Sequence, residues 1–219
     1  MPAETWQLIY NGTLETLYMT TVSLILSYLV GLPLGIALVT TEEGHILENR
    51  PVNQVLSAVV NAARSVPFII LMVAVIPITR AITGTTIGTT AAIVPLVIGA
   101  IPFVGRMVET SLKEVDRGIV EAALAMGASP WQIIYKVLIP EVIPSLVLGA
   151  TITFITLIGY SAMAGFIGGG GLGDIAVRYG YYRYKTDIMI YTVFLLLVMV
   201  QLIQSLGNYA SRKLNKKVK

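Results

Sequence analysis

The 219-residue sequence contains no cysteine and only one histidine, His45. A chain without cysteine cannot form a disulfide, an iron–sulfur cluster or a cysteine-ligated zinc site. A single histidine in a polar stretch leaves nothing from which a histidine metal cluster could be built. We therefore expect no metal site and no cofactor bound by this chain.

Charged residues are also scarce. Aspartate, glutamate, lysine and arginine together form 12% of the sequence, whereas 55% is hydrophobic. Soluble domains carry about 25% charged residues, so this composition predicts an integral membrane protein surrounded by lipid. The net charge of +3 does not indicate a nucleic-acid partner, because the basic residues concentrate in the final segment RKLNKKVK.

Long apolar segments recur along the chain, and a membrane-crossing helix needs about 20 such residues. We place five spans at residues 16–41, 52–79, 81–105, 142–166 and 188–210. The expected fold is an all-α integral membrane protein with five transmembrane helices, in which residues 1–219 form a single domain. Arg64 lies within the second segment, where a charge either reaches toward a membrane interface or pairs inside the protein. We favour the first.

A run of glycines, Gly168 to Gly171, predicts a loop after the fourth span. The segment that follows, residues 174–187, carries four tyrosines and three basic residues. This mixture is typical of a helix at the membrane interface. The glycine run is not followed by the Lys-Ser or Lys-Thr pair of a phosphate-binding loop, so we expect this chain not to bind ATP itself.

The segment 121–140, EAALAMGASPWQIIYKVLIP, is amphiphilic and lies between two apolar segments. Gly127 can adopt the left-handed conformation that closes a helix. Ser129 can cap a second helix, with Pro130 at its first position and Gln132 completing a capping box. The pattern predicts two short helices whose small residues let another protein approach closely. A connector helix that only anchors the chain at the interface remains the alternative.

The fourth span carries a stripe of small and polar residues. At 100° per residue, one helix face collects Gly149, Thr153, Thr156, Tyr160 and Met163. Small polar residues followed by an aromatic ring and a flexible thioether could line a translocation path and close it as a gate. Close helix–helix packing explains the same residues equally well, because membrane helices use small residues at their contacts.

The basic residues predict an orientation in the membrane. With the C-terminus in the cytoplasm and the N-terminus outside, eleven basic residues lie inside and four outside. The inner set is Arg50, Arg64, Arg106, Lys113, Arg117, Lys136, Arg212, Lys213, Lys216, Lys217 and Lys219, and the outer set is Arg80, Arg178, Arg183 and Lys185. This orientation places residues 121–140 in the cytoplasm.

One spacing in this segment identifies a family. The pattern Glu-Ala-Ala, three residues, Gly, nine residues and aliphatic-x-aliphatic-Pro is formed by Glu121, Ala122, Ala123, Gly127, Val137, Ile139 and Pro140. It resembles the cytoplasmic coupling motif of permease subunits of bacterial ABC importers, in which isoleucine and leucine are commoner than this Val137 and Ile139. The passages NGTLETLYMT, RSVPFIILMV, GYSAMAG and GGGGLGDIAVRYGYYRY are similar to permeases of methionine importers.

The resemblance implies a type I ABC importer permease in the bacterial inner membrane, with a coupling helix inside region 117–140, between the third and fourth spans. It also implies a homodimer, two cytoplasmic subunits that bind ATP and magnesium, and an external substrate-binding lipoprotein. This chain would then not be an enzyme, and it would move methionine into the cytoplasm by alternating access. By the same resemblance, Met163 lies in the gate region.

Other classes of protein fit the sequence less well. An importer permease for another amino acid or small solute keeps every feature above, because only the resemblance names methionine. An ion-coupled secondary transporter usually has internal repeats and acidic residues within its spans, and neither is present here. An intramembrane protease would need a histidine or paired aspartates at membrane depth, and a simple anchor would leave residues 121–140 unexplained.

Overall fold

The structure, a computed structural model, describes residues 3–215, and in this part of the chain every regular element is helical. The α-helices are α1 (Ala3–Thr40), α2 (Arg50–Ser65), α3 (Phe68–Ala74), α4 (Ile76–Thr83), α5 (Thr89–Leu112), α6 (Arg117–Ala125), α7 (Pro130–Ile133), α8 (Ile139–Glu141), α9 (Ile143–Ala164), α10 (Gly171–Ile175) and α11 (Thr186–Leu214). Short helices of other types occupy Ile134–Leu138, Gly165–Ile167 and Ala176–Tyr181. The predicted all-α fold is confirmed.

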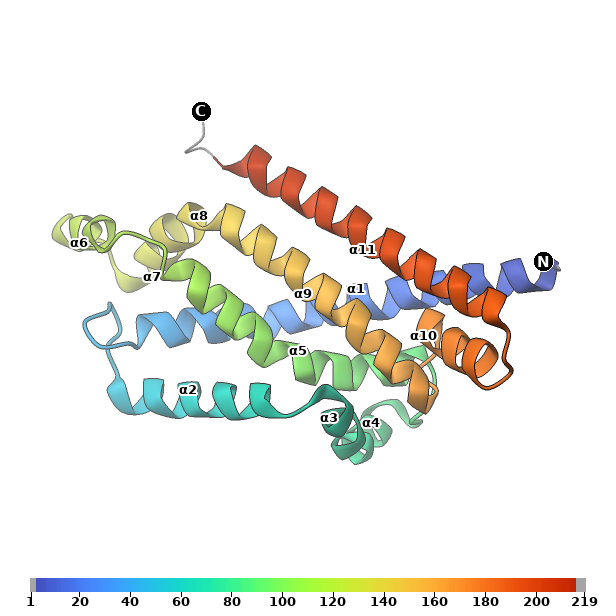
Figure 1. The fold of residues 1–219 in the computed structure, drawn as a ribbon. Coiled ribbons are helices and arrows are strands. Elements are labelled where there is room, and N and C mark those ends of the chain that lie inside the picture. Colours follow the sequence, from blue (N-terminus) through green and yellow to red (C-terminus); the bar gives the residue numbers. More distant parts are fainter. Residues whose placement is uncertain (1–2, 216–219) are drawn as a thin grey trace.

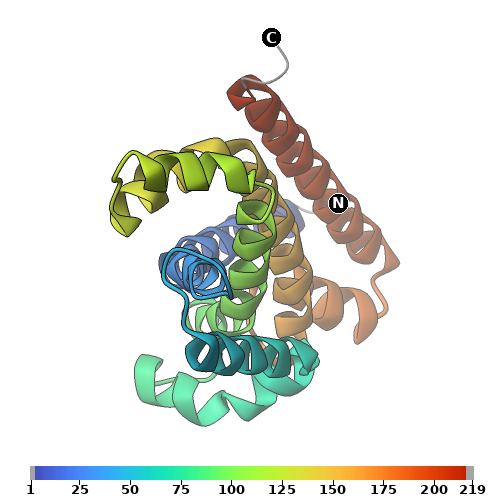
Figure 2. The ribbon, with the colours of Figure 1, turned by 90° about the vertical axis from the view of Figure 1, so that its left-hand side faces the viewer.

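The long helices α1, α5, α9 and α11 run along the length of the molecule (Figure 1). The loop 41–49, α6 and the C-terminal end of α11 lie at one end, which we call the α6 end (Figure 1). The start of α1, the turn after α4 and α10 lie at the other end, which we call the α10 end (Figure 1). Viewed from the α6 end, α6 and α7 arch in front of the long helices, with α2 on one side and α11 on the other (Figure 2).

Four helical segments are long and apolar enough to cross a membrane: Glu4–Thr40, Thr89–Leu112, Ile143–Ile167 and Thr186–Leu214. A fifth crossing is counted only if α2 and α3, which meet at 101°, form one span. The first helix begins at Ala3 rather than at residue 16, and the third begins at Thr89 rather than at residue 81. The fourth and fifth lie close to their predicted positions.

The second predicted span, residues 52–79, is not one helix. Val66 adopts an extended conformation with ψ 123°, and Pro67 follows it. A proline excludes the residue before it from helical geometry, so α2 stops here and α3 leaves in a new direction. Residues 81–83 then belong to α4, and a turn with positive φ at Gly84 and Gly88 leads into α5.

The main contact in the bundle is between α1 and α5. A Cβ atom at Gly31 would lie 2.6 Å from the Val104 side chain, and one at Gly35 would lie 2.5 Å from the Val108 side chain. Val104 and Val108 are fully buried. Glycine at these two positions therefore lets the helices approach closely, as small residues do at contacts between membrane helices.

The glycine-rich segment is folded against α1. Gly168 to Gly170 form the predicted connection, but the helix α10 already begins at Gly171. The backbone N–H of Gly171 donates to the Glu15 carboxylate at 2.7 Å, and the N–H of Leu172 donates to the Thr16 hydroxyl at 2.9 Å. These side chains satisfy N–H groups that the first turn of a helix leaves without partners.

Candidate coupling surface and translocation face

Interactions between residues close in sequence determine where α6 begins and ends. The Asp116 carboxylate accepts a hydrogen bond from the N–H of Gly118 at 2.6 Å and caps the start of the helix. At the other end Gly127 has φ +80°, and the N–H of Ala128 donates to the carbonyl of Ala123 at 3.1 Å. This is the left-handed closure that the sequence predicts.

The start of α7 is also as predicted. The N–H of Gln132 donates to the Ser129 hydroxyl at 3.4 Å, and the N–H of Ser129 donates to the Gln132 side chain at 2.9 Å. Pro130 occupies the first turn, where its missing N–H costs nothing. The prediction of two short helices with a sharp turn between them is confirmed.

The coupling motif lies partly on the surface and partly beneath it. Glu121, Ala122 and Gly127 are exposed, whereas Ala123 is buried and packs inward. Further along, Val137 and Ile139 are half-buried and Pro140 is exposed. We call the α6–α7 surface a set of exposed residues from α6, the turn after it, α7 and the helical segment Ile134–Leu138: Glu121, Ala122, Leu124, Ala125, Met126, Gly127, Trp131 and Tyr135.

This surface is apolar for a part of the chain outside the predicted spans. Met126 is 82% exposed, and Trp131 and Tyr135 are 66% and 64% exposed. The two aromatic rings stack on each other with centroids 6.2 Å apart. Exposed apolar side chains gathered at one place are typical of a protein-interaction site.

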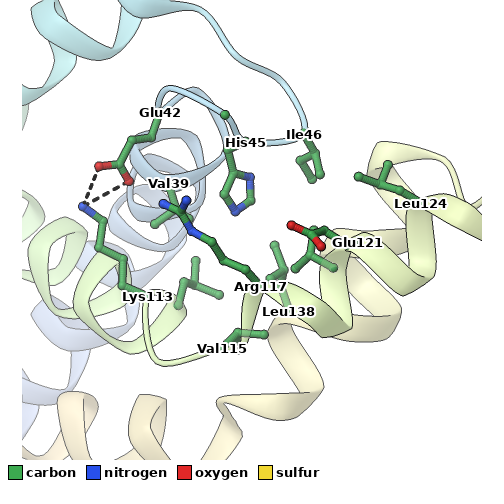
Figure 3. Close-up of a pocket in the computed structure, with 13 residues that line it drawn as sticks. Val39, Glu42, His45, Ile46, Lys113, Val115, Arg117, Glu121, Leu124 and Leu138 are labelled. Carbon is green, nitrogen blue, oxygen red and sulfur yellow. Dashed lines mark hydrogen bonds and ion pairs between the residues drawn. The ribbon is translucent and has the colours of Figure 1, made fainter.

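A cavity of about 380 Å³ lies between α6 and the loop 41–49. Glu42 and His45 of the loop line it, as do Lys113, Arg117 and Glu121 (Figure 3). The imidazole of His45, the guanidinium of Arg117 and the carboxylate of Glu121 all point toward this space (Figure 3). Glu121 therefore stands at the edge of a polar cavity as well as on the α6–α7 surface.

Burial lowers the pKa of His45, and the nearby Arg117 lowers it further, while Glu42 acts in the opposite direction. Because an ordinary histidine already has a pKa near 6.5, this imidazole is neutral at pH 7. The positive charge at the cavity comes from Arg117 and Lys113 alone among its described lining residues.

A buried carboxylate holds the α6 end together. Glu109 of α5 is 7% exposed and forms ion pairs with Arg106 and with Lys113, the latter at 3.1 Å. Arg106 also donates to the Asn61 side chain of α2 at 2.7 Å, and Lys113 reaches Glu42 in the loop 41–49 at 3.2 Å. This network was not among the features expected from the sequence, although Arg106, Glu109 and Lys113 are spaced to lie on one helix face.

We expect Glu109→Ala to lower the free energy of unfolding by about 3 kcal/mol, because it leaves the half-buried Arg106 without its counter-charge. The control is Glu43→Ala, which removes an exposed ion pair with Arg50 and should cost less than about 1 kcal/mol. Thermal unfolding of the detergent-purified protein measures both. Equal losses of stability would show that the network does not hold the helices together.

The residues of the predicted stripe on α9 differ in burial from one end of the helix to the other. Thr153 is fully buried, and its hydroxyl donates to the carbonyl of Gly149 at 2.8 Å. A Cβ at Gly149 would lie 3.5 Å from the Tyr28 hydroxyl of α1. Thr156 is half-buried and donates to the carbonyl of Ile152. In the isolated chain this half of the stripe therefore packs inside the bundle.

The second half of the stripe, Tyr160 and Met163, is less buried. Tyr160 stacks on Phe68 of α3, with ring centroids 4.1 Å apart and an angle of 2° between the planes. Met163 is 43% exposed. Of the five residues, only Met163 is exposed on the surface of the single chain.

Arg64 lies in the last turn of α2. This helix ends at Ser65, and its last turn lies beside the middle of α5. Arg64 lines a cavity of about 120 Å³ together with Gly99 and Phe103 of α5 and Tyr160 of α9.

Residues 31–219 match the family described as the binding-protein-dependent transport system inner membrane component. The chain belongs to this family. It is 55% identical over 208 residues to a probable D-methionine transport system permease protein, MetI, of Vibrio cholerae, covering 95% of this chain and 92% of that protein. A similarly described protein of Pasteurella multocida is 46% identical, covering 97% of this chain and 98% of its own length.

Solved structures of ABC transporters also match this chain. A chain of the MetNI methionine ABC transporter, in inward-facing conformations, is 49% identical and superposes with a TM-score of 0.97 over 99% of this chain and 100% of its own. An amino acid ABC transporter solved with histidines shares the fold at 23% identity, with a TM-score of 0.78. The protein therefore has the fold of a type I ABC importer permease and is an inner-membrane component of such an importer.

Proposed function

We propose that this permease translocates methionine, in its L- and D-forms, into the cytoplasm by alternating access, driven by ATP that other subunits hydrolyse. The observation that carries the proposal is the similarity of nearly the whole chain to permeases described as D-methionine transporters. The apolar, well-capped α6–α7 surface supports it, because an ATP-driven permease needs a rigid element on which the ATP-binding subunits can act.

The proposed assembly is a homodimer of this chain with two ATP-binding subunits, which hold the ATP and magnesium, and an external substrate-binding lipoprotein. The exposed motif residues Glu121, Ala122 and Gly127 would contact the ATP-binding subunits directly. Ala123, Ile139 and Pro140 would act from beneath, by fixing how α6 and the following helices sit on the bundle.

In the proposed orientation the α6 end faces the cytoplasm and the N-terminus lies outside. Basic residues support it, because they favour the cytoplasmic side of membrane proteins. The described basic residues at the α6 end include Arg50, Lys113, Arg117, Arg212 and Lys213. Three further residues counted for this side, Lys216, Lys217 and Lys219, lie outside the described part of the chain.

Movement of the α6–α7 surface would reach the long helices through a shared core. Buried side chains from α6, from α7 and the helical turn after it, and from α1 and α5 pack together: Ala123, Ile133, Ile134, Leu138, Val39, Val104, Val108 and Leu112. Packed cores transmit displacement because they deform little. Closure of the ATP-binding subunits would therefore shift α5 and α1 with α6.

Gentle solubilisation and capture of a tagged permease tests the assembly. We expect an ATP-binding subunit to co-purify in a one-to-one ratio, and the reconstituted complex to import labelled methionine only with ATP and the binding protein. A permease that purifies alone from membranes containing its neighbours would contradict the proposal. ATP-driven uptake of another amino acid but not of methionine would retain the mechanism and replace the substrate.

Within this function we propose that Gly149, Thr153, Thr156, Tyr160 and Met163 line the path, with Met163 forming the closing constriction. We expect Met163→Ala to loosen the closed state and raise basal ATP hydrolysis several-fold, since the smaller side chain closes the path less well. The matched control is Ile152→Ala, a residue of the same helix with the same 43% exposure. Equal effects of both changes would indicate that Met163 only packs.

A further inference from the structure

Arg64 lies in the last turn of α2, about midway along the length of the bundle (Figure 1). It lies fourteen residues after Arg50, the first residue of α2, so the helical rise places it roughly 21 Å from the α6 end of that helix. Its cavity is bounded by Gly99, ten residues after the start of α5, and by Phe103, nine residues before its end. Since α5 is long enough to cross a membrane and the cavity lies beside its middle, we infer that the cavity lies near mid-membrane.

The guanidinium of Arg64 has no partner there. Among the described residues it makes no hydrogen bond, ion pair or ring contact. The cavity wall contains no acidic residue; its lining is Ala63, Arg64, Val66, Phe68, Leu71, Gly99, Phe103 and Tyr160. A charge at membrane depth is costly, and where one persists it generally faces a water-filled path or a counter-charge.

The side chain is nevertheless exposed in the single chain. Exposure to lipid would leave the charge unsolvated, so the geometry favours a path between two copies of the permease. A guanidinium is the side chain that best recognises a carboxylate, because its donors match both oxygens. Every α-amino acid carries such a carboxylate.

The rest of the cavity is apolar and aromatic. The stacked rings of Phe68 and Tyr160 form one wall, and Phe103 belongs to the same lining. Thioethers pack favourably against aromatic rings. The volume of about 120 Å³ is well below the roughly 300 Å³ of a closed ligand pocket, which suits a brief contact during transit rather than tight binding.

We propose that Arg64 is a transit site for the substrate: its guanidinium binds the α-carboxylate of the amino acid, and the wall of Phe68, Tyr160 and Phe103 receives the apolar side chain. This inference rests on the proposed function, because it requires that an amino acid passes between the copies. It adds a specificity-determining cation that the coupling motif and the α9 stripe do not contain.

The absence of cysteine allows a direct test with a single thiol. Ala63→Cys places one in the cavity wall while leaving Arg64 intact, and Ala81→Cys places one at an exposed position of α4 away from the cavity. Both are made in the complex with the ATP-binding subunits and labelled with a water-soluble thiol reagent. We expect methionine to slow labelling of Ala63→Cys but not of Ala81→Cys.

Methioninamide, which lacks the carboxylate, should give little protection of Ala63→Cys. Adding Arg64→Gln should remove the protection by methionine, and Arg64→Gln alone should lower uptake about tenfold, as expected for loss of a charge-assisted hydrogen bond, with Arg64→Lys retaining part of the activity. Capture of the ATP-binding subunits by each variant reports whether it still assembles.

Equal protection by methionine and methioninamide, or none in a complex that imports methionine, would overturn the inference and leave the proposed function standing. The labelling of Ala63→Cys with Arg64 present does not depend on whether Arg64→Gln folds. Failure of the unaltered complex to import methionine would instead count against the proposed function.

Discussion

Replacing Gly165 by alanine is expected to remove most of the folded protein from the membrane. A Cβ at this position would lie 2.3 Å from the backbone nitrogen of Asp174 and 2.4 Å from the backbone carbonyl carbon of Gly173. Neither atom belongs to a side chain that could rotate away. The connection after α9 and the helix α10 would have to separate, at a cost of about 3 kcal/mol or more.

The matched control is Gly159→Ala on the same part of the chain. A Cβ at Gly159 has nothing within 4 Å, and alanine is favoured over glycine in a helix by about 1 kcal/mol. Gly159→Ala should therefore accumulate normally. Fluorescence-detected size-exclusion chromatography of solubilised membranes measures both variants, and normal amounts of monodisperse Gly165→Ala protein would refute the close crossing of these segments.

Glu121→Arg and Gly127→Val are expected to abolish most ATP-driven uptake while leaving the permease in the membrane. Glu121→Arg reverses a charge on the α6–α7 surface. Gly127→Val meets no neighbouring atom, but it puts a branched side chain at φ +80° and strains the turn that fixes α6 against α7. Uptake and co-purification of the ATP-binding subunits should therefore fall together.

Two control substitutions separate docking from general damage at the α6 end. Glu43→Arg reverses an exposed charge in the loop 41–49, outside the α6–α7 surface. Gly44→Val imposes the same backbone strain, at φ +75° and with nothing within 4 Å. We expect both to retain uptake. If the controls lose as much uptake as Glu121→Arg and Gly127→Val, the α6–α7 surface is not the coupling site.

Features set by a few neighbouring residues were predictable from the sequence. The turn at Gly127 and the capping box of Ser129 and Gln132 depend on conformational preferences and hydrogen bonds within four residues. The membrane class follows from a composition that lacks charge. The family was expected from a resemblance to a known motif, carried by residues at fixed spacing between Glu121 and Pro140, and packing does not alter that spacing.

Features that depend on contacts with a neighbouring helix could be recognised only in the tertiary structure. Thr153 and Met163 share a face of α9, yet α1 covers one and leaves the other open, because helix periodicity identifies a face but not its neighbour. Gly165 has an ordinary helical φ, so only the crossing of α10 explains why it must be glycine.

The position of Arg64 depends both on local backbone preferences and on tertiary packing. The Val66-Pro67 pair is visible in the sequence and locally forbids a continuous helix, but the direction taken afterwards is set by packing of α3 against α5 and α9. The two helices meet at 101° at this break. The sequence alone therefore predicts a membrane permease with two short, well-capped helices between its third and fourth spans, whereas the position of Arg64 along the bundle is decided by long-range contacts, which residue spacing does not encode.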